Sequence, residues 1–295
     1  MQSTIVTAVL LPLALAVVML GMGLSLVPAD FRRVRRYPRA VAVGLVGQML
    51  LLPLIGLLIV RVVPLQPDLA VGLMVLALCP GGPSSNVLTY LARGDVALSV
   101  TLTAINSVLS VLTIPFLTNL VLQMILGRST TIVLPIGSSL LQILLITLLP
   151  IALGMVLRQR FPRGASRLEK PMSRLAVGLL ALIIGLLLLR EGSKLPGFVV
   201  QVGSGVLLLN LLAMAAGLAT GRLFKLPLAQ QICVAIEVGL QNGTLAIAIT
   251  AGLLNNAEMA IPAALYSLLM YGTGFAVVLY GRRATRAATL RTGSA

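Results

Sequence analysis

The sequence has 295 residues, of which 58% are hydrophobic and 10% charged, and its mean hydropathy is +1.07. Soluble globular domains carry about 25% charged residues, so this composition excludes a soluble enzyme or binding domain and predicts a membrane protein. The net charge of +15 does not indicate nucleic-acid binding here, because the basic residues lie in short loops between apolar segments. The chain has no histidine, which excludes His-based zinc sites and histidine general bases.

Apolar segments of about the 20 residues needed to cross a bilayer recur from end to end of the chain. They predict nine transmembrane helices, over residues 4–27, 40–60, 69–92, 96–126, 132–157, 173–189, 196–221, 227–254 and 262–281. We interpret the first as a membrane span and not as a signal peptide, because it has neither a basic flank before it nor a clear cleavage site. The expected fold class is therefore an all-α membrane protein.

The basic residues are divided very unequally between the two sides of these predicted spans. Eighteen of the 22 Lys and Arg lie on one side, around the loops that follow the first, third, fifth, seventh and ninth spans. Such an excess marks the cytoplasmic side of a membrane. We therefore expect a multi-pass protein of the plasma (inner) membrane, with its N-terminus outside and its C-terminus in the cytoplasm.

The third and eighth predicted spans contain unusual interiors. Residues 80–83 are Pro-Gly-Gly-Pro, which an α-helix cannot run through unbroken, and residues 237–244 combine one carboxylate, two amides, a hydroxyl and two glycines. Paired interruptions in the two halves of a membrane protein predict a transporter site, in which freed carbonyls bind a cation and half-helix N-termini face an anion. Two kinks that serve only helix packing are the alternative interpretation.

Glu237 is the only acidic residue that falls deep within a predicted span. A carboxylate there costs at least about 2.5–3.5 kcal/mol on insertion scales, so its default interpretation is functional. No predicted span places a Lys or Arg beside it at depth, so Glu237 is either protonated or neutralised by a bound cation. Neighbouring oxygen donors such as Gln241 and Asn242 suit a hard cation. The alternative is a structural glutamate that hydrogen bonds alone satisfy.

Further polar residues accompany the interruptions. Ser99 and Thr103 are four residues apart, so their hydroxyls share one helical face, and Asn106 follows three residues later. Gln48 lies inside the second predicted span. Each is weak evidence alone, because a Ser or Thr in a membrane helix often bonds its own backbone. Asn210 is assigned to packing.

Several motifs together resemble the bile acid:sodium symporter family: CPGGPSSN followed by VLTYLARGDVALSV, IEVGLQNGTLA, GMGLSL and VGQMLLLP. The resemblance implies an inverted repeat of five helices, a panel domain, and a core domain in which two discontinuous helices cross at their breaks. The panel would comprise residues 1–39 and 127–190 (spans one, five and six). The core would comprise residues 40–126 and 191–283 (spans two to four and seven to nine), before a cytoplasmic tail at 284–295. Nine spans resemble the animal carriers, whereas bacterial relatives commonly have ten.

The resemblance also implies two sodium sites and a substrate site. The first sodium site would comprise Ser85, Asn86, Ser99, Thr103 and Glu237. The second would comprise Gln48, Glu237, Gln241 and the backbone carbonyls of Val238 and Leu240. The substrate-binding candidates are Pro83, Asn242, Gly243 and Thr244. Pro83 stands where many relatives have threonine, which removes a hydroxyl and a backbone donor, so the resemblance does not fix the substrate.

These observations predict sodium-coupled symport of a small organic anion by alternating access, with two Na⁺ ions as co-transported ligands. The anion would be bile acid-like, pantoate, a keto acid or a related carboxylate, and no obligate protein partner is indicated. A sodium-independent carrier or exporter of the same superfamily is the alternative, which the complete set of sodium ligands disfavours. No enzyme is expected: an aspartyl protease needs paired carboxylates, and neither zinc ligands nor a base beside Ser84 or Ser85 is evident.

Overall fold

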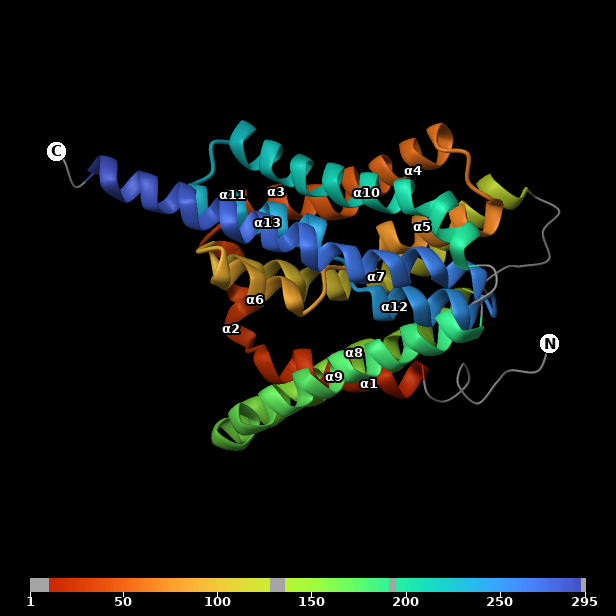
Figure 1. The fold of residues 1–295 in the computed structure, drawn as a ribbon. Helices are drawn as coiled ribbons and strands as arrows, with labels where there is room; N and C mark the ends of the chain where they lie inside the picture. The colour runs from red at the N-terminus through yellow and green to blue at the C-terminus, as the bar shows by residue number, and fades with distance from the viewer. Residues whose placement is uncertain (1–10, 128–135, 191–194, 293–295) are drawn as a thin grey trace.

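The computed structural model describes residues 11–127, 136–190 and 195–292, which are almost entirely helical (Figure 1). In chain order the elements are α1 Leu11–Ser25, α2 Pro28–Arg32, η2 Arg33–Arg35, α3 Pro38–Val46, η3 Gly47–Leu51, α4 Leu52–Val62, α5 Pro67–Leu78, α6 Ser84–Leu91, α7 Val96–Leu126, α8 Ile136–Arg160, α9 Pro162–Arg190, α10 Leu195–Leu223, α11 Leu228–Gly239, α12 Gly243–Ile247, η4 Ala248–Leu253, η5 Glu258–Ala260 and α13 Ile261–Thr292. Within these residues no strand is formed beyond one isolated bridge, so the predicted all-α class is confirmed.

Proline positions explain where several helices begin and where one of them stops. Helices α2, α3 and α5 begin at Pro28, Pro38 and Pro67. Proline lacks a backbone N–H, and at the start of a helix this costs no hydrogen bond, because the first N–H groups have no intrahelical acceptor. Pro80 and Pro83 lie between α5 and α6, where the chain leaves the helical conformation. The break predicted in the third apolar segment is therefore present, and a second break separates α11 from α12.

Five helices among the described residues are long and apolar enough to cross a bilayer: Pro38–Val62, Val96–Leu126, Ile136–Arg160, Val199–Leu223 and Glu258–Arg286. A sixth is obtained if α1 and the segment Pro28–Arg35, which are bent by 72° relative to each other, count as one span. The apolar helices beside the breaks are shorter, because each forms only half of a predicted span. The count of nine spans therefore stays a prediction.

Two predicted boundaries differ from the observed helices. The basic segment around residues 158–174, expected as a loop, lies at the end of α8 and in the first turns of α9, with only Phe161 between the two helices. Helix α13 continues to Thr292, so most of the predicted tail at 284–295 is helical. Hydropathy marks only where the apolar residues end. A helix can continue past that point through good helix formers such as Arg, Lys and Ala, because its backbone hydrogen bonds are internal.

Helices α1, α8 and α9 pack against one another and lie below the remaining helices in Figure 1. They contact the rest of the protein mainly through α7 against α8 and through α1 against η4. These three helices cover the segments that the sequence assigns to the predicted panel. The domain boundaries and the inverted repeat themselves stay predictions.

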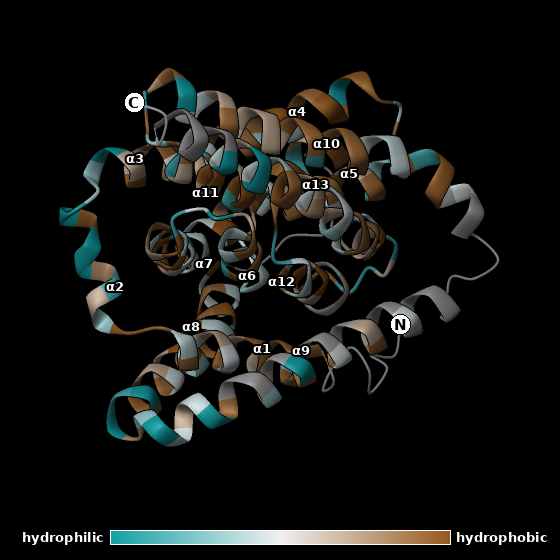
Figure 2. Cartoon of the chain, turned by 60° about the vertical axis from the view of Figure 1, so that its left-hand side comes forward, coloured by the Kyte–Doolittle hydropathy of each residue, from teal (hydrophilic) through white to brown (hydrophobic). Residues whose placement is uncertain are grey.

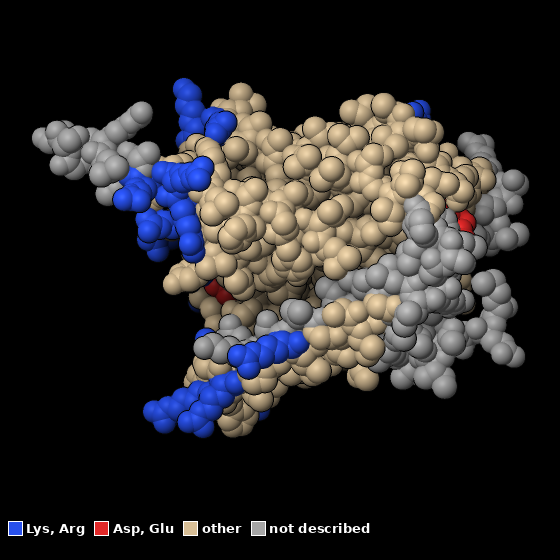
Figure 3. All heavy atoms as spheres, viewed as in Figure 1, with Lys and Arg blue, Asp and Glu red and all other residues tan. Residues whose placement is uncertain are grey.

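The surface separates apolar from charged residues. Hydrophobic residues predominate along α4, α5 and α10, whereas hydrophilic residues collect around α2 (Figure 2). Most of the Lys and Arg visible in Figure 3 lie at one end of the molecule, where α13 leaves the body and where α8 meets α9. This gathering agrees with the charge asymmetry in the sequence, while the side that faces the cytoplasm stays a prediction.

Two glycines allow the backbones of α1 and α8 to touch. A Cβ atom added to Gly23 would lie 2.2 Å from the carbonyl oxygen of Ile151, and one added to Gly154 would lie 2.6 Å from that of Leu20. Real Cβ atoms do not approach backbone atoms so closely. The crossing therefore depends on small residues, as is common between membrane helices.

Gly154→Ala is expected to lower the free energy of unfolding by about 1–3 kcal/mol, because the added methyl group must displace the backbone of α1. Thermal unfolding of the purified protein in detergent measures this loss. Gly137→Ala is the matched control on the same helix, because no atom of another described segment lies within 4 Å of its added Cβ. Equal unfolding temperatures for the two variants would contradict the close crossing.

Candidate functional site

The two helix breaks meet in the interior of the protein. Gly81 in the first break and Gln241 in the second form an antiparallel bridge. The backbone N–H of Asn242 donates to the carbonyl of Pro80 at 2.9 Å. Unwound backbone is tolerated at membrane depth only where protein or a cavity surrounds it, and here each break satisfies part of the other.

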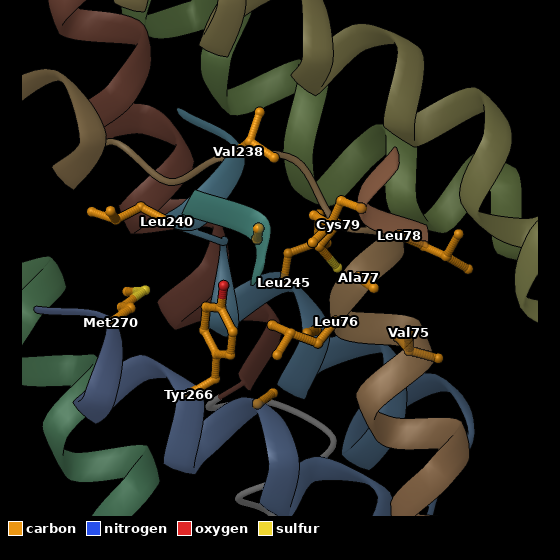
Figure 4. Packing of buried hydrophobic residues seen from close by; sticks show 14 of the residues in the cluster. Val75, Leu76, Ala77, Leu78, Cys79, Val238, Leu240, Leu245, Tyr266 and Met270 are labelled. Carbon is orange, nitrogen blue, oxygen red and sulfur yellow. The ribbon is translucent and has the colours of Figure 1, made fainter. Parts of the chain in front are cut away.

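Buried side chains from α5, α11, α12 and α13 hold this crossing in place (Figure 4). Tyr266 of α13 is fully buried, and its hydroxyl group points toward the break that follows α11 (Figure 4). That hydroxyl donates to the carbonyl of Gly239 at 2.8 Å, and Nδ2 of Asn210 on α10 donates to the same oxygen at 2.9 Å. The last carbonyl of α11, freed by the break, is therefore satisfied twice.

The roles of Asn210 and Tyr266 were not predicted. The sequence assigns Asn210 to packing and gives no reason to single out Tyr266. The available signal was weak: a buried tyrosine hydroxyl and a buried amide each need a hydrogen-bond partner. Sequence spacing did not indicate that both partners are the same carbonyl.

The carboxylate of Glu237 is the centre of the first cluster of polar side chains, and Glu237 is only 1% exposed. Its Oε1 accepts hydrogen bonds from Ser85 Oγ at 2.6 Å and from Ser99 Oγ at 2.5 Å, and its Oε2 accepts one from Thr103 Oγ1 at 2.9 Å. Asn86 Oδ1 is 2.8 Å from Ser99 Oγ. The structure thus brings all five residues predicted for the first sodium site together, from α6, α7 and α11.

Glu237 has no ion-pair partner in the part of the chain that the structure describes. Neutral hydroxyl groups orient their dipoles toward the carboxylate, but they do not cancel its charge. Gly81 leaves room beside it, since a Cβ atom there would lie 3.1 Å from Glu237 Oε2. The cluster is therefore a buried, oxygen-rich site at which a small cation would supply the missing positive charge.

Gln48 and Gln241 form a second cluster next to the first. Gln48 lies in the π-helical turn η3, and its Nε2 donates to the carbonyl of Cys79 at 3.0 Å and to Gln241 Oε1 at 2.7 Å. Gln241 Nε2 donates in turn to the carbonyl of Val238 at 2.7 Å. Gln48 Oε1 is buried and has no partner within the described residues, so this cluster offers an unused acceptor.

The structure brings most, but not all, of the second predicted sodium set into direct contact. The carbonyl of Leu240 accepts the backbone N–H of Gly82 across the crossing at 3.4 Å and is hydrogen-bonded to neither glutamine side chain. Glu237 also makes its recorded hydrogen bonds to the hydroxyl cluster and not to Gln48 or Gln241.

The substrate-binding candidates surround the same crossing. Asn242 Oδ1 accepts the backbone N–H of Leu245 at 3.0 Å and so caps α12, while Asn242 Nδ2 is buried without a partner among the described residues. Thr244 is buried, and Pro83 is partly exposed at the start of α6. Gly243 packs against α13, where a Cβ atom would lie 1.8 Å from Ser267 Oγ. The close packing of α12 against α13 therefore explains why position 243 is a glycine.

Comparison with known proteins identifies the chain's relatives. The sequence model of the Sodium Bile acid symporter family matches residues 12–196. The chain is 32% identical over 254 residues to "Probable sodium/metabolite cotransporter BASS1, chloroplastic" of Arabidopsis thaliana, which covers 86% of this chain and 62% of that protein. It is 30% identical over 254 residues to "Uncharacterized sodium-dependent transporter YocS" of Bacillus subtilis (strain 168), covering 86% of this chain and 77% of that protein.

A third relative is "Probable sodium/metabolite cotransporter BASS2, chloroplastic" of Oryza sativa subsp. japonica, which is 30% identical over 275 residues, or 92% of this chain and 64% of that protein. The chain thus spans less than two thirds of the length of both chloroplastic relatives. The resemblance inferred from the motifs at the two breaks is confirmed. With its long apolar helices and this match over more than half of its length, the chain is an integral membrane protein that belongs to the Sodium Bile acid symporter family.

Proposed function

We propose that this protein is a secondary active symporter that couples the entry of sodium ions to that of a small organic anion. The observation that carries the proposal is the carboxylate of Glu237, buried at the crossing of two broken helices with three hydroxyl donors and no recorded ion pair. A buried carboxylate without a fixed counter-charge is suited to a cation that comes and goes. The names of the relatives, sodium/metabolite cotransporter and sodium-dependent transporter, support the same function.

We assign the first sodium ion to the hydroxyl cluster. Its ligands would be Ser85, Asn86, Ser99, Thr103 and Glu237, which are oxygen donors of the kind that hard cations prefer. The second ion would bind at Gln48, Glu237, Gln241 and the carbonyls of Val238 and Leu240. The unused acceptor of Gln48 supports this second assignment, because an acceptor without a hydrogen-bond donor can accept a cation instead.

We assign the anion to the side of the crossing that carries Asn242. Its Nδ2 is a buried donor without a recorded partner, and such a donor suits a carboxylate oxygen. Pro83, Gly243 and Thr244 would complete the contact surface. Because Asn242 follows Gln241 directly, an ion at the second site would fix the backbone that presents this donor. Binding of sodium at the second site would in this way increase the affinity for the substrate.

Alternating access would arise from movement between two groups of helices. We assign residues 1–39 and 127–190 to the panel, and residues 40–126 and 191–283 to the core that carries both crossing helices. The close contact among α1, α8 and α9 supports their movement as one unit. A sodium-independent carrier of the same superfamily is the competing function, and it would leave the oxygen clusters around Glu237 without a role.

Uptake of labelled carboxylates into proteoliposomes tests the proposal. A panel of a bile acid, pantoate and several keto acids would be offered with either sodium or potassium outside, and protein-free liposomes would give the background. We expect at least one of these anions to accumulate only in sodium. Equal uptake in sodium and potassium would favour the sodium-independent carrier.

The two sodium sites are expected to respond separately to substitution. Thr103→Ala at the first site and Gln48→Ala at the second should each raise the half-saturating sodium concentration by about tenfold, the effect of losing one polar contact to a charged ligand. Sodium titrations of substrate uptake measure this change. Thr147→Ala is the control, since among the described residues this buried hydroxyl on α8 bonds only its own helix backbone at Ile143. If both site variants had the same half-saturating sodium concentration as the parent, the assigned ligands would be wrong.

A further inference from the structure

Asn106, in the first half of α7, has no hydrogen-bond partner for either of its polar atoms within the described residues. Its exposed fraction is 0%. Burial of an amide without partners is costly, so such a group is as a rule satisfied by a ligand or by ordered water. Asn106 contacts none of the polar clusters through a recorded hydrogen bond, and the proposed sodium and substrate assignments do not use it.

The direction in which Asn106 points follows from its neighbours on α7. Ser99 and Thr103 both face Glu237, because their hydroxyl groups donate to its carboxylate. At about 100° per residue, Asn106 lies within about 60° of both of them around the helix axis, and about 4.5 Å beyond Thr103 along it. Ser110, which is also buried, continues the same stripe one turn farther on.

The pattern of unused atoms distinguishes three kinds of ligand. Gln48 lacks a partner only for its acceptor, which suits a cation, and Asn242 lacks one only for its donor, which suits an anion. Asn106 lacks partners for both its acceptor Oδ1 and its donor Nδ2. A bare cation would satisfy only the first of these atoms and a carboxylate only the second, whereas water both donates and accepts.

We propose that Asn106 binds ordered water that completes the coordination of the sodium ion at Glu237. One water would ligate the ion through its oxygen and donate to Asn106 Oδ1, while Nδ2 donates to a second water of the same cluster. This site lies on the side of Glu237 away from the basic end of the molecule, because α7 begins three residues after Arg93, which lines the same pocket as Arg282 of α13, and Asn106 lies farther along α7 than Ser99 and Thr103. The inference rests on the proposed function, since it requires a sodium ion at Glu237.

Thermal unfolding of the purified protein tests this inference, first without substrate and then with an anion that the uptake panel shows to be transported. Sodium chloride would be titrated at constant ionic strength with potassium chloride. Asn106→Leu, of similar size, should unfold in potassium at the parental temperature or above it, because an apolar side chain replaces a buried amide that makes no hydrogen bond to the described protein residues. Its half-saturating sodium concentration should rise about three- to tenfold, as expected for the loss of one water-mediated hydrogen bond. Asn106→Ser, which can still bind water, should fall between the parent and Asn106→Leu.

Thr118→Val is the matched control, because Thr118 is another buried α7 residue whose hydroxyl has no recorded partner. It lies about 18 Å from Asn106 along the helix axis, so its sodium titration should be parental. Three results would overturn the inference: a parental titration for Asn106→Leu, an equal loss of stability at every sodium concentration, or a shift that occurs only when substrate is present. The last would make Asn106 a substrate contact. A parent that sodium does not stabilise would overturn the proposed function as well.

Discussion

Glu237→Gln is expected to abolish sodium-dependent uptake while leaving the protein folded. The substitution keeps the size and shape of the side chain and removes only its negative charge. Removal of one partner from a buried charge pair, here the carboxylate opposite the bound ion, typically costs about 3–5 kcal/mol, which corresponds to a loss of sodium affinity of about two to four orders of magnitude. At sodium concentrations that saturate the parent, the variant should therefore show only background uptake.

The fold should tolerate this change because each hydroxyl donor has a second acceptor close by. Ser85 Oγ lies 2.9 Å from the carbonyl of Gly82, Ser99 Oγ lies 2.8 Å from Asn86 Oδ1, and Thr103 Oγ1 lies 3.0 Å from the carbonyl of Ser99. The three hydroxyl groups are therefore not left without acceptors when the carboxylate is replaced.

Initial uptake rates in proteoliposomes and the unfolding temperature in detergent measure the two halves of this prediction. Glu258→Gln is the matched control, since it neutralises a partly exposed carboxylate in η5 that lies outside both polar clusters. Sodium-coupled uptake by Glu237→Gln at the parental rate would remove the central claim about the site. A variant that fails to fold would instead show that Glu237 is needed for structure.

The sequence was most informative where it broke the rules of a continuous apolar helix. Pro80 and Pro83 cannot belong to an unbroken membrane helix, and the structure does separate α5 from α6 at that point. Glu237 was recognisable because no other acidic residue falls deep in an apolar segment. The four-residue spacing of Ser99 and Thr103 correctly placed both hydroxyls on one face, where both contact the same carboxylate.

The remaining features depend on contacts between segments that are far apart in the sequence. Gln48 bonds Gln241 across 193 positions, and Tyr266 and Asn210 converge on one carbonyl, so helical spacing alone did not indicate these partners. Hydropathy also did not mark the true helix ends, because α13 continues as a charged helix past its apolar part. Sequence periodicity describes the faces of single helices, whereas partners are fixed by the packing of all of them.

Uptake of a monovalent anion is expected to be electrogenic and strongly concentrative. Two sodium ions that enter with one monoanion carry one net positive charge inward, which contributes about 2.3 kcal/mol at 100 mV. A tenfold sodium gradient adds about 1.4 kcal/mol for each ion. The total of about 5 kcal/mol is enough for the anion to accumulate a few thousandfold.

Vesicles whose membrane potential is clamped with potassium and valinomycin measure this effect. An inside-negative potential should accelerate or deepen uptake of a confirmed monoanion, and the ratio of sodium to substrate flux should be two. A divalent substrate, or a single sodium ion with a monoanion, would carry no net charge and make uptake nearly indifferent to voltage. Voltage-independent uptake of a confirmed monoanion would therefore rule out two-sodium coupling even if Glu237 proved essential, because one ion at the hydroxyl cluster would then be sufficient.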